Sequence, residues 1–358
     1  MSRIMFLGKH NVLGVNSKQT PEMFDRYGPM ILNGLDATVP FKEDTELFDI
    51  HSYHLGLSDA YGHRVDPSIG MGKCLRPTLC LFVCDALGGS VEQCLDAAIS
   101  IELIHNFSLI HDDIQDQDSE RRHRKTVWKV WGIPKALISG NALHTLGDMA
   151  TSMQPKQSDH NVALSKLLTN AYMSMIMGQC EDLSFESADY VNVQMYLDMI
   201  AGKTGALIQS SIMMGALSAT KELDQAKKFE EIGFLLGQAF QIRDDYLGVW
   251  GDPAITGKPI GGDIYRKKKT YPVIHGMENV SGTTRKDFKK RYHKEVLSDY
   301  DVSWIMAVLE DAGSRQSTLD FIDDISNRAK MSMLEIGLPE WAREEMGYLI
   351  EFLSTRVK

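Results

Sequence analysis

The sequence has no uninterrupted apolar run of the roughly 18 residues that a membrane-spanning helix requires. Residues 1–10 contain a short apolar patch, but neither the long apolar core nor the small-residue cleavage site of a signal peptide. These absences predict a soluble, cytoplasmic chain without stable membrane insertion.

Cysteine is scarce, and the five cysteines form no Cys-x-x-Cys pair. Such a pattern gives little support to a disulfide framework or a zinc site. Cys80 and Cys84 stand one helical turn apart in an apolar segment. They are therefore expected to be small buried hydrophobic residues in a reducing compartment.

Basic residues are fewer than acidic ones: the chain has 38 Lys and Arg residues and 48 Asp and Glu residues, which gives a net charge of −10. Nucleic-acid-binding proteins normally present a basic face, so this balance argues against nucleic acid as a partner. An acidic protein that binds an anionic substrate needs metal ions or local clusters of Lys and Arg. Both patterns occur further along the chain.

Alternating strand-like runs with hairpin turns are missing, whereas helical periodicity recurs through most of the chain. The sequence therefore predicts an all-α fold. The expected helices cover residues 21–35, 47–57, 76–88, 91–116, 135–150, 161–182, 190–219, 225–249, 302–310, 316–334 and 340–356. The breaks are too short for domain linkers, which predicts a single domain over residues 1–358. Its expected parts are an N-terminal helical extension (1–65), a catalytic core (66–280) and C-terminal helices (281–358).

Three carboxylates end a long apolar segment in the motif Asp112-Asp113-x-x-Asp116. On a helix, Asp112 and Asp116 project from one face and Asp113 lies beside them. Like charges this close repel one another unless a divalent cation neutralises them. Taken alone, the motif is also compatible with a helix end that carries solvated acids.

A second acidic motif, Phe240-Gln241-x-x-Asp244-Asp245, ends another apolar helix, and Asp252 follows after a glycine. Two acidic clusters at one apolar cavity could hold a diphosphate between several metal ions. The pair of motifs therefore favours metal binding over solvated acids.

Two cations lie in a segment that begins with Gly72 and ends with Pro77. Lys73 offers a point charge and Arg76 a planar fork, which together suit a second phosphate group. A cation near a helix start gains little from the macrodipole, so a purely structural role is less natural.

With these motifs and several shorter ones, residues 65–275 resemble the trans-isoprenyl diphosphate synthases of the polyprenyl synthetase family. The motifs, in the family's order, are Gly72-Lys73-x-x-Arg76-Pro77, Ile101-Glu102-Leu103-Ile104-His105, Asp112-Asp113-x-x-Asp116, Arg121-Arg122, Gly178-Gln179, Lys203-Thr204, Phe240-Gln241-x-x-Asp244-Asp245, Gly257-Lys258 and Lys268-x-Thr270. The resemblance implies an isoprenoid synthase fold, with ten or more helices around a central apolar cavity, and a homodimer. It also implies magnesium-assisted, head-to-tail condensation of isopentenyl diphosphate with an allylic diphosphate.

The resemblance assigns roles to the matched residues. About three magnesium ions are expected at Asp112, Asp113, Asp116, Asp244 and Asp245. The cations expected at the allylic diphosphate are Arg121, Lys203, Lys258 and Lys268. Those expected to hold isopentenyl diphosphate are Lys73, Arg76, His105 and Arg122. The reacting carbon centre is expected to be lined by Phe240, Gln241 and Thr204. The expected catalytic residues are the five aspartates together with Lys203, Thr204 and Gln241.

Three positions depart from the family pattern. The segment Arg121–Thr126 reads Arg-Arg-His-Arg-Lys-Thr instead of Arg-Arg-Gly-x-Pro-Thr, which leaves the conformation of this loop open. Gly248 stands where the last aspartate of the second motif is expected, which leaves Asp244 and Asp245 as the metal ligands, with Asp252 as a candidate supporting carboxylate. Asn141 stands where an aspartate is common.

Product length is expected to depend on residues that precede Asp112 on its helix. Ser108, four residues back on the same face, is small, whereas Phe107 is bulky and Ile101 lies deeper. In the family, an aromatic residue at the fifth position with no two-residue insertion resembles geranylgeranyl diphosphate synthases. Farnesyl diphosphate is the alternative product.

Two other functions share part of this pattern. A class I terpene cyclase has the first aspartate motif, but it would not need His105 or the 72–77 segment. No clear Asn-Asp-x-x-Ser-x-x-x-Glu-like motif is present. A non-catalytic subunit of a heteromeric synthase would be free to lose metal ligands, which this chain keeps.

Overall fold

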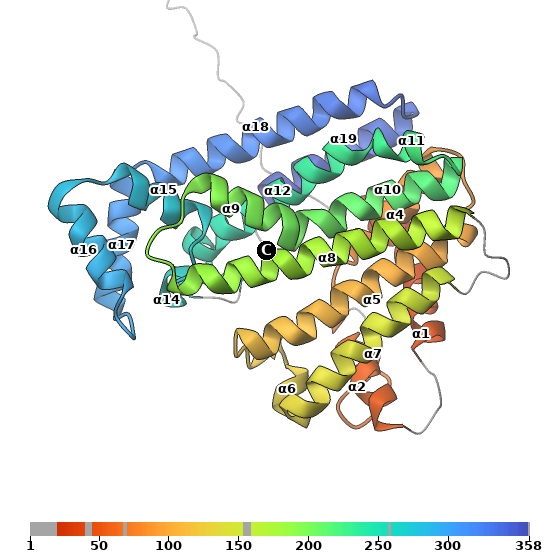
Figure 1. Cartoon of the computed structure of the whole chain (residues 1–358), viewed down its shortest axis with the longest axis horizontal. Coiled ribbons are helices and arrows are strands. Elements are labelled where there is room, and N and C mark those ends of the chain that lie inside the picture. The colour runs from red at the N-terminus through yellow and green to blue at the C-terminus, as the bar shows by residue number, and fades with distance from the viewer. Residues whose placement is uncertain (1–19, 40–44, 67–69, 153–158, 257–258, 357–358) are drawn as a thin grey trace, which may run out of the picture.

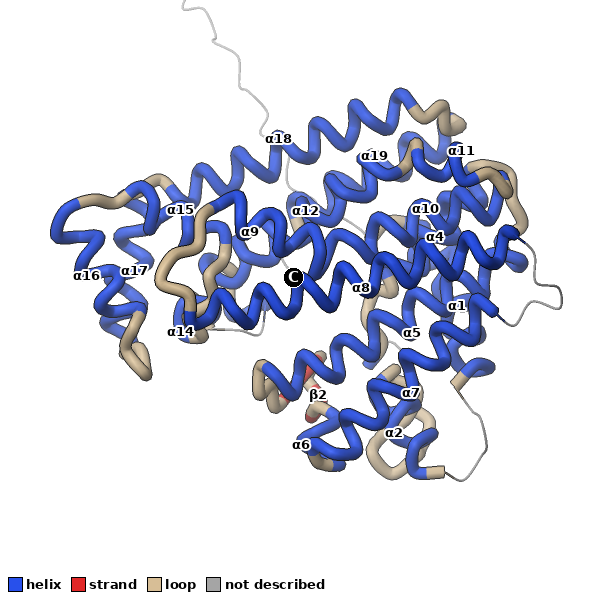
Figure 2. The backbone as a smooth tube through the Cα atoms, in the orientation of Figure 1, coloured by secondary structure: helices blue, strands red, loops and turns tan. Residues whose placement is uncertain are grey.

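The computed structural model describes residues 20–39, 45–66, 70–152, 159–256 and 259–356, which form a bundle of helices (Figure 1). The all-α prediction is confirmed, since the sole sheet in these ranges is one two-stranded hairpin (Figure 2). The longer helices are α1 (Glu22–Thr38), α2 (Glu46–His54), α4 (Leu75–Ala86), α5 (Val91–Gln115), α7 (Ile133–Ser152), α8 (Asp159–Ser187), α10 (Ala206–Thr220), α12 (Glu230–Trp250), α18 (Ser314–Glu335) and α19 (Glu340–Thr355). No helix among the described residues has the length and apolar character to cross a membrane.

Helices α5 and α12 run through the interior and carry the two acidic motifs near their C-terminal ends. Both helices are buried because they carry apolar side chains on nearly all sides. Ile101 and Leu235, for example, are 0% exposed. Ser90 begins α5 by accepting a hydrogen bond from the backbone N–H of Gln93. Helix α10 packs against α4, α5, α8 and α12 and so links the two interior helices.

Two glycines of α12 let this helix approach η1 and α10 closely. A Cβ atom at Gly237 would lie 2.6 Å from the Cα atom of Gly205, and one at Gly233 would lie 2.6 Å from the Cα atom of Gln209. Any larger residue would push these backbones apart.

The segment expected as one helix over 190–219 is interrupted. It consists of α9 (Val193–Ile200), a π-helical turn η1 (Ala201–Gly205) and α10. The π turn contains the Lys203-Thr204 motif, and wide turns of this kind often occur at functional sites. A periodicity of 3.6 residues cannot reveal the extra residue that produces such a turn.

The segment that departs from the family pattern forms a tight hairpin. Strand β1 (Glu120–Arg121) pairs antiparallel with β2 (Arg124–Lys125). Arg122 and His123 have φ angles of 51° and 61°, as in the two-residue turns that match strand twist. The sequence left the conformation of this loop open, because neither residue is a usual turn former.

Several short helices were not predicted, namely α6 (Val127–Trp131), α11 (Leu223–Lys227) as a separate helix, α13 (Pro253–Thr256), α14 (Gly262–Tyr265), α15 (Tyr271–Asn279) and α16 (Gly282–Tyr292). Helix α16 contributes few apolar side chains, chiefly Phe288 and Tyr292, so its periodicity is weak. With α17 (Asp299–Asp311) it forms the lobe at the left of Figure 1, around a second, smaller apolar cluster.

The N-terminal segment belongs to the bundle, since α1 packs against α4 and α5 and α2 packs against α7. The predicted burial of Cys80 and Cys84 is confirmed, with 0% exposure for both. All five cysteines are free thiols.

Candidate active site

A cavity of about 850 Å³ opens between α5, α8, η1 and α12. The predicted site residues that line it are Arg76, His105, Phe107, Ser108, Asp112, Asp116, Arg121, Arg122, Lys203, Thr204, Phe240, Gln241, Asp244 and Lys268. A cavity of about 290 Å³ shares part of this wall and adds Asp245. Lys258 falls outside the described residues. Motifs that are far apart in the sequence thus meet around one space.

The first acidic cluster divides between two environments. Asp112 and Asp116 line the large cavity, and burial raises the pKa of Asp112 to about 6. Asp113 is only 1% exposed, and its Oδ1 lies 2.8 Å from Nε and 2.7 Å from Nη2 of Arg121. Two carboxylates are therefore available to the cavity, while the third holds an arginine.

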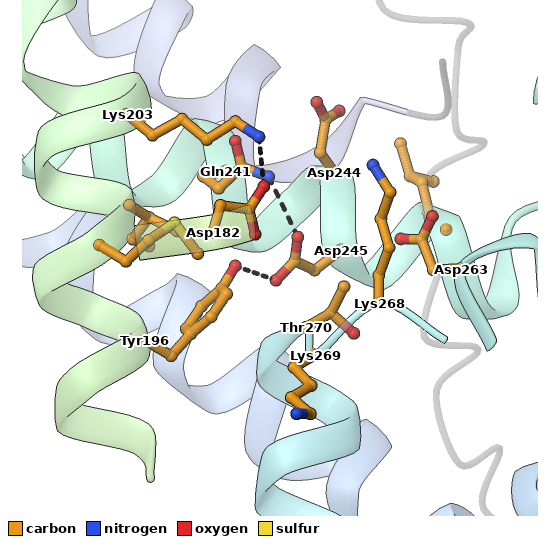
Figure 3. A pocket seen from close by; sticks show the side chains of 14 residues that line it. Asp182, Tyr196, Lys203, Gln241, Asp244, Asp245, Asp263, Lys268, Lys269 and Thr270 are labelled. Atoms are coloured by element: carbon orange, nitrogen blue, oxygen red, sulfur yellow. Dashed lines mark hydrogen bonds and ion pairs between the residues drawn. The ribbon is translucent and has the colours of Figure 1, made fainter. Parts of the chain in front are cut away.

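The second cluster is embedded in hydrogen bonds (Figure 3). Asp245 is 3% exposed and accepts hydrogen bonds from the hydroxyl of Tyr196, from Nε2 of Gln241 (3.1 Å) and from the backbone N–H of Tyr271 (3.0 Å). Burial raises the pKa of Asp245 to about 7, although the Tyr196 hydroxyl favours the carboxylate. Asp244 lines both cavities, so this cluster combines one open and one anchored carboxylate.

A carboxylate that the sequence did not identify fills the space beside Gly248. A Cβ atom at Gly248 would lie 1.9 Å from Oδ2 of Asp263, which lines the smaller cavity (Figure 3). Asp252 lines neither cavity, and its Oδ1 accepts a hydrogen bond from the N–H of Ala254 (2.9 Å). Asp263 thus lies closer to the position of the missing aspartate than Asp252 does.

The π turn projects two side chains into the cavity. The ammonium of Lys203 pairs with Asp182 of α8, and the hydroxyl of Thr204 donates to Oε1 of Gln241 (2.7 Å). A Cβ atom at Gly178 would lie 2.3 Å from the backbone nitrogen of Lys203, so only glycine lets α8 approach the turn this closely. The structure explains the Gly178 motif as a packing requirement.

A basic pocket adjoins the acidic end of the cavity. Nη1 of Arg76 lies 3.1 Å from Nε2 of His105. Burial, followed by the charge of Arg76, lowers the pKa of His105, so this imidazole is neutral and accepts the hydrogen bond. Arg122 lines the same region, whereas Lys73 lies outside the lining and places its ammonium 4.7 Å from the ring centroid of Phe352.

The other end of the cavity is aromatic. Phe107 and Ser108 line it, but Ile101 is fully buried and does not. The ring of Phe107 meets His144 of α7 at 4.9 Å, and His144 meets Tyr172 of α8 at 4.7 Å, both edge-on. The sequence indicated neither His144 nor Tyr172, because both come from helices distant in the chain.

The C-terminal end of the chain also reaches the site. The guanidinium of Arg356 pairs with Asp244 and lies 4.1 Å from the ring centroid of Phe240. Arg243 holds this segment by donating from Nε to the carbonyl oxygen of Arg356 (2.8 Å). No sequence motif marked Arg356.

The carboxylates form no preassembled metal cage, since no three His, Cys, Asp or Glu side chains of the described chain converge on one point. Cations lie against them instead: Nζ of Lys268 is 3.2 Å from Asp116, and Arg356 pairs with Asp244. Magnesium usually takes one or two carboxylates and completes its shell with water and substrate phosphate. Asp112 and Asp116, with the second cluster opposite, therefore fit magnesium ions that bind together with a diphosphate.

Comparison with known proteins agrees with this geometry. Residues 59–309 match the family model described as polyprenyl synthetase. A (2E,6E)-farnesyl diphosphate synthase from Mycobacterium bovis is 33% identical over 317 residues, 87% of each chain. A geranylgeranyl diphosphate synthase from Mycobacterium tuberculosis is 39% identical over 231 residues, which cover 64% of this chain and 65% of that protein. The crystal structure of a polyprenyl synthetase from Streptomyces coelicolor has a TM-score of 0.85 and 31% identity, and covers 92% of this chain and 98% of its own. The chain therefore belongs to the polyprenyl synthetase family.

Proposed function

We propose that this enzyme condenses isopentenyl diphosphate with an allylic diphosphate, head to tail and in the trans configuration, and that its main product is geranylgeranyl diphosphate. Family membership and similarity to farnesyl and geranylgeranyl diphosphate synthases make the chain a short-chain prenyltransferase. The observation that carries the proposal is one cavity with an acidic end, an adjoining basic pocket and an aromatic end.

The acidic end suits the allylic diphosphate. Asp112 and Asp116 would hold magnesium on one side and Asp244 on the other, with Asp245 and Asp263 behind it. When bound, magnesium would neutralise the diphosphate as the allylic carbon–oxygen bond breaks. The cations Arg121, Lys203 and Lys268 line the same region and would stabilise the same departing charge.

The basic pocket suits isopentenyl diphosphate. Neutral His105 orients the fork of Arg76, and Arg122 adds a second guanidinium. The allylic carbocation needs neighbours that stabilise it without reacting, which Phe240, Gln241 and Thr204 provide through a ring face, an amide oxygen and a hydroxyl. The released diphosphate takes the final proton, so no side-chain base is required.

The aromatic end suits the growing tail and limits its length. Ser108 leaves space beside the first aspartate motif, whereas Phe107 backed by His144 closes the cavity further along α5. This wall favours the geranylgeranyl chain over longer products. Farnesyl diphosphate is the second candidate, because the Mycobacterium bovis relative with that product name matches 87% of this chain.

The proposal includes a homodimer in the cytoplasm. Helices α7 and α8 expose large apolar side chains, among them Ile138 (60%), Met173 (52%) and Met177 (59%). A second copy that covers this face would remove these side chains from water. The free cysteines suit the reducing cytoplasm.

One assay tests the reaction and the product together. Radiolabelled isopentenyl diphosphate is incubated with dimethylallyl, geranyl or farnesyl diphosphate and magnesium, and the dephosphorylated products are sized by chromatography. Geranylgeraniol should dominate with all three starters, and EDTA should abolish the reaction until magnesium is restored. Products that stop at farnesol would support the second candidate. A cyclic hydrocarbon formed without incorporation of label would contradict the proposal.

A further inference from the structure

We infer that Arg124 is a positioning residue that fixes the β1–β2 hairpin, and through it Arg122, against the segment that follows α2. Arg124 lies outside the motifs that the family resemblance assigned. The inference rests on the proposed function, in which Arg122 holds isopentenyl diphosphate.

The guanidinium of Arg124 bridges two carbonyl groups near the end of α2. Nη1 donates to the carbonyl oxygen of Tyr53 (2.9 Å), and Nη2 donates to that of Ser58 (2.6 Å). The same group lies 4.0 Å from the centroid of the Tyr53 ring, a cation–π contact. The Tyr53 hydroxyl in turn donates to the carbonyl oxygen of Lys125 (2.7 Å). One strand of the hairpin is thus tied to the N-terminal segment at three polar contacts.

Both hairpin arginines also fit against the loop that precedes Arg76. A Cβ atom at Gly70 would lie 2.6 Å from Nη1 of Arg124, and one at Gly72 would lie 2.4 Å from Nη2 of Arg122. A Cβ atom at either position would displace the guanidinium group that lies there. Arg124 and Arg122 therefore both pack against the loop that contains Gly70 and Gly72.

The hairpin needs an external anchor because its own turn is costly. Arg122 and His123 both have positive φ angles, and neither is a glycine. The left-handed backbone region is unfavourable for a residue with a side chain. Without Arg124, other conformations of residues 120–125 compete with the observed one.

The two potential substrate ligands depend on this anchor to different degrees. Arg121 is held independently, since Asp113 contacts both its Nε and its Nη2. Arg122 has one long hydrogen bond, from Nη1 to the carbonyl oxygen of Gly70 (3.4 Å). Loss of Arg124 should therefore affect the pocket of isopentenyl diphosphate more than that of the allylic substrate.

The test compares Arg124→Ala, Arg124→Lys and the control Arg328→Ala, which removes an arginine from an exposed ion pair on α18. For Arg124→Ala, the KM of isopentenyl diphosphate should rise about tenfold or more, while the allylic KM and kcat change less than threefold. Arg124→Lys keeps the charge but lacks the rigid planar fork whose two nitrogens reach the two carbonyl oxygens, so its KM for isopentenyl diphosphate should stay close to that of Arg124→Ala. The control should match the wild type.

Two further measurements separate positioning from loss of fold and from failure of the proposed function. Hydrogen exchange should become faster in residues 119–126 of the Arg124 variants, whether or not the wild type turns over the expected substrates. Tyr53→Phe keeps the ring but removes the hydrogen bond to Lys125, and should shift the same KM in the same direction by a smaller factor. Unchanged exchange and unchanged KM in Arg124→Ala and Tyr53→Phe, or equal rises in both KM values, would overturn the inference.

Discussion

Asp112 and Asp244 stand on different walls of the large cavity, where each is expected to share magnesium with the diphosphate. Replacement of either by alanine should lower kcat by roughly a hundred- to a thousandfold, because the ionisation step loses part of the stabilising charge. Steady-state turnover at saturating substrate and magnesium measures the effect. Asp252→Ala is the matched control, since Asp252 lines neither cavity. Near-normal turnover of both main variants would contradict the metal assignment.

Phe107 is the residue at which we expect product length to change. Phe107→Ala removes the ring that meets His144, so the cavity should accept one or more further isoprene units, each buried methylene contributing roughly 0.8 kcal/mol. Ser108→Phe should narrow the same cavity and shorten the main product. Chromatography of the dephosphorylated products measures both changes.

Ile101→Ala is the control for product length. Ile101 is fully buried outside the cavity, so its truncation should cost about 2–5 kcal/mol of stability without a change in product. If Phe107→Ala and Ser108→Phe leave the products unchanged, another element determines the length.

Among the elements, the π turn η1 depends on its close approach to α8. Gly178→Ala would place a Cβ atom 2.3 Å from the backbone nitrogen of Lys203, so the turn must shift and move Lys203 and Thr204. We expect kcat to fall at least tenfold while circular dichroism shows unchanged helix content. Gly347→Ala in α19 is the control, because nothing lies within 4 Å of that site and alanine there should stabilise the helix by roughly 0.5–1 kcal/mol. Full activity of Gly178→Ala would contradict the expectation that the close approach of α8 positions Lys203 and Thr204 for catalysis.

At the scale of the whole molecule, the exposed apolar face of α7 and α8 predicts association. Met173→Glu with Met177→Glu should convert a dimer into monomers, since both side chains are more than half exposed in the single chain. Light scattering coupled to size exclusion gives the mass. Met331→Glu, on α18 and 64% exposed, is the control and should leave the mass unchanged. A monomeric wild type would contradict the homodimer.

The stability of the molecule should also depend on pH through His51. Its Nε2 lies 3.2 Å from the carbonyl oxygen of Ser139 on α7, and burial lowers its pKa to about 4. The unfolded chain, with a histidine pKa of about 6.5, binds the proton first as pH falls, so stability is lost progressively between about pH 6.5 and pH 4. The total loss is about 3 kcal/mol. His51→Gln keeps a donor and should lose less stability in urea denaturation between pH 7 and pH 4.5. Equal losses in variant and wild type would contradict this assignment.

Much of the candidate site was predictable because its signals are local. Asp112 and Asp116 line one cavity, as their spacing on a single helix predicted. The long apolar segments that end in the two acidic motifs form the interior helices α5 and α12. These features depend on residue type and on spacing within a single helix.

Other features depended on contacts between distant segments. Asp263 fills the space beside Gly248, and Arg356 reaches Asp244 from the end of the chain. Asp113 accepts a hydrogen bond from Arg121, whereas the adjacent Asp112 lines the cavity. Such pairings have no signature in local spacing, because each side chain's surroundings come from another element.

The amino-acid sequence by itself determined the all-α class, the two acidic motifs and the family, since periodicity and motif order are properties of the chain. Only the tertiary structure decided which carboxylates line the cavity, that Lys203 and Thr204 stand on a π turn, and that Arg124 ties the hairpin to the segment after α2. The physical reason is that burial, close backbone approach and hydrogen bonding at these positions are determined by neighbours far away in the sequence.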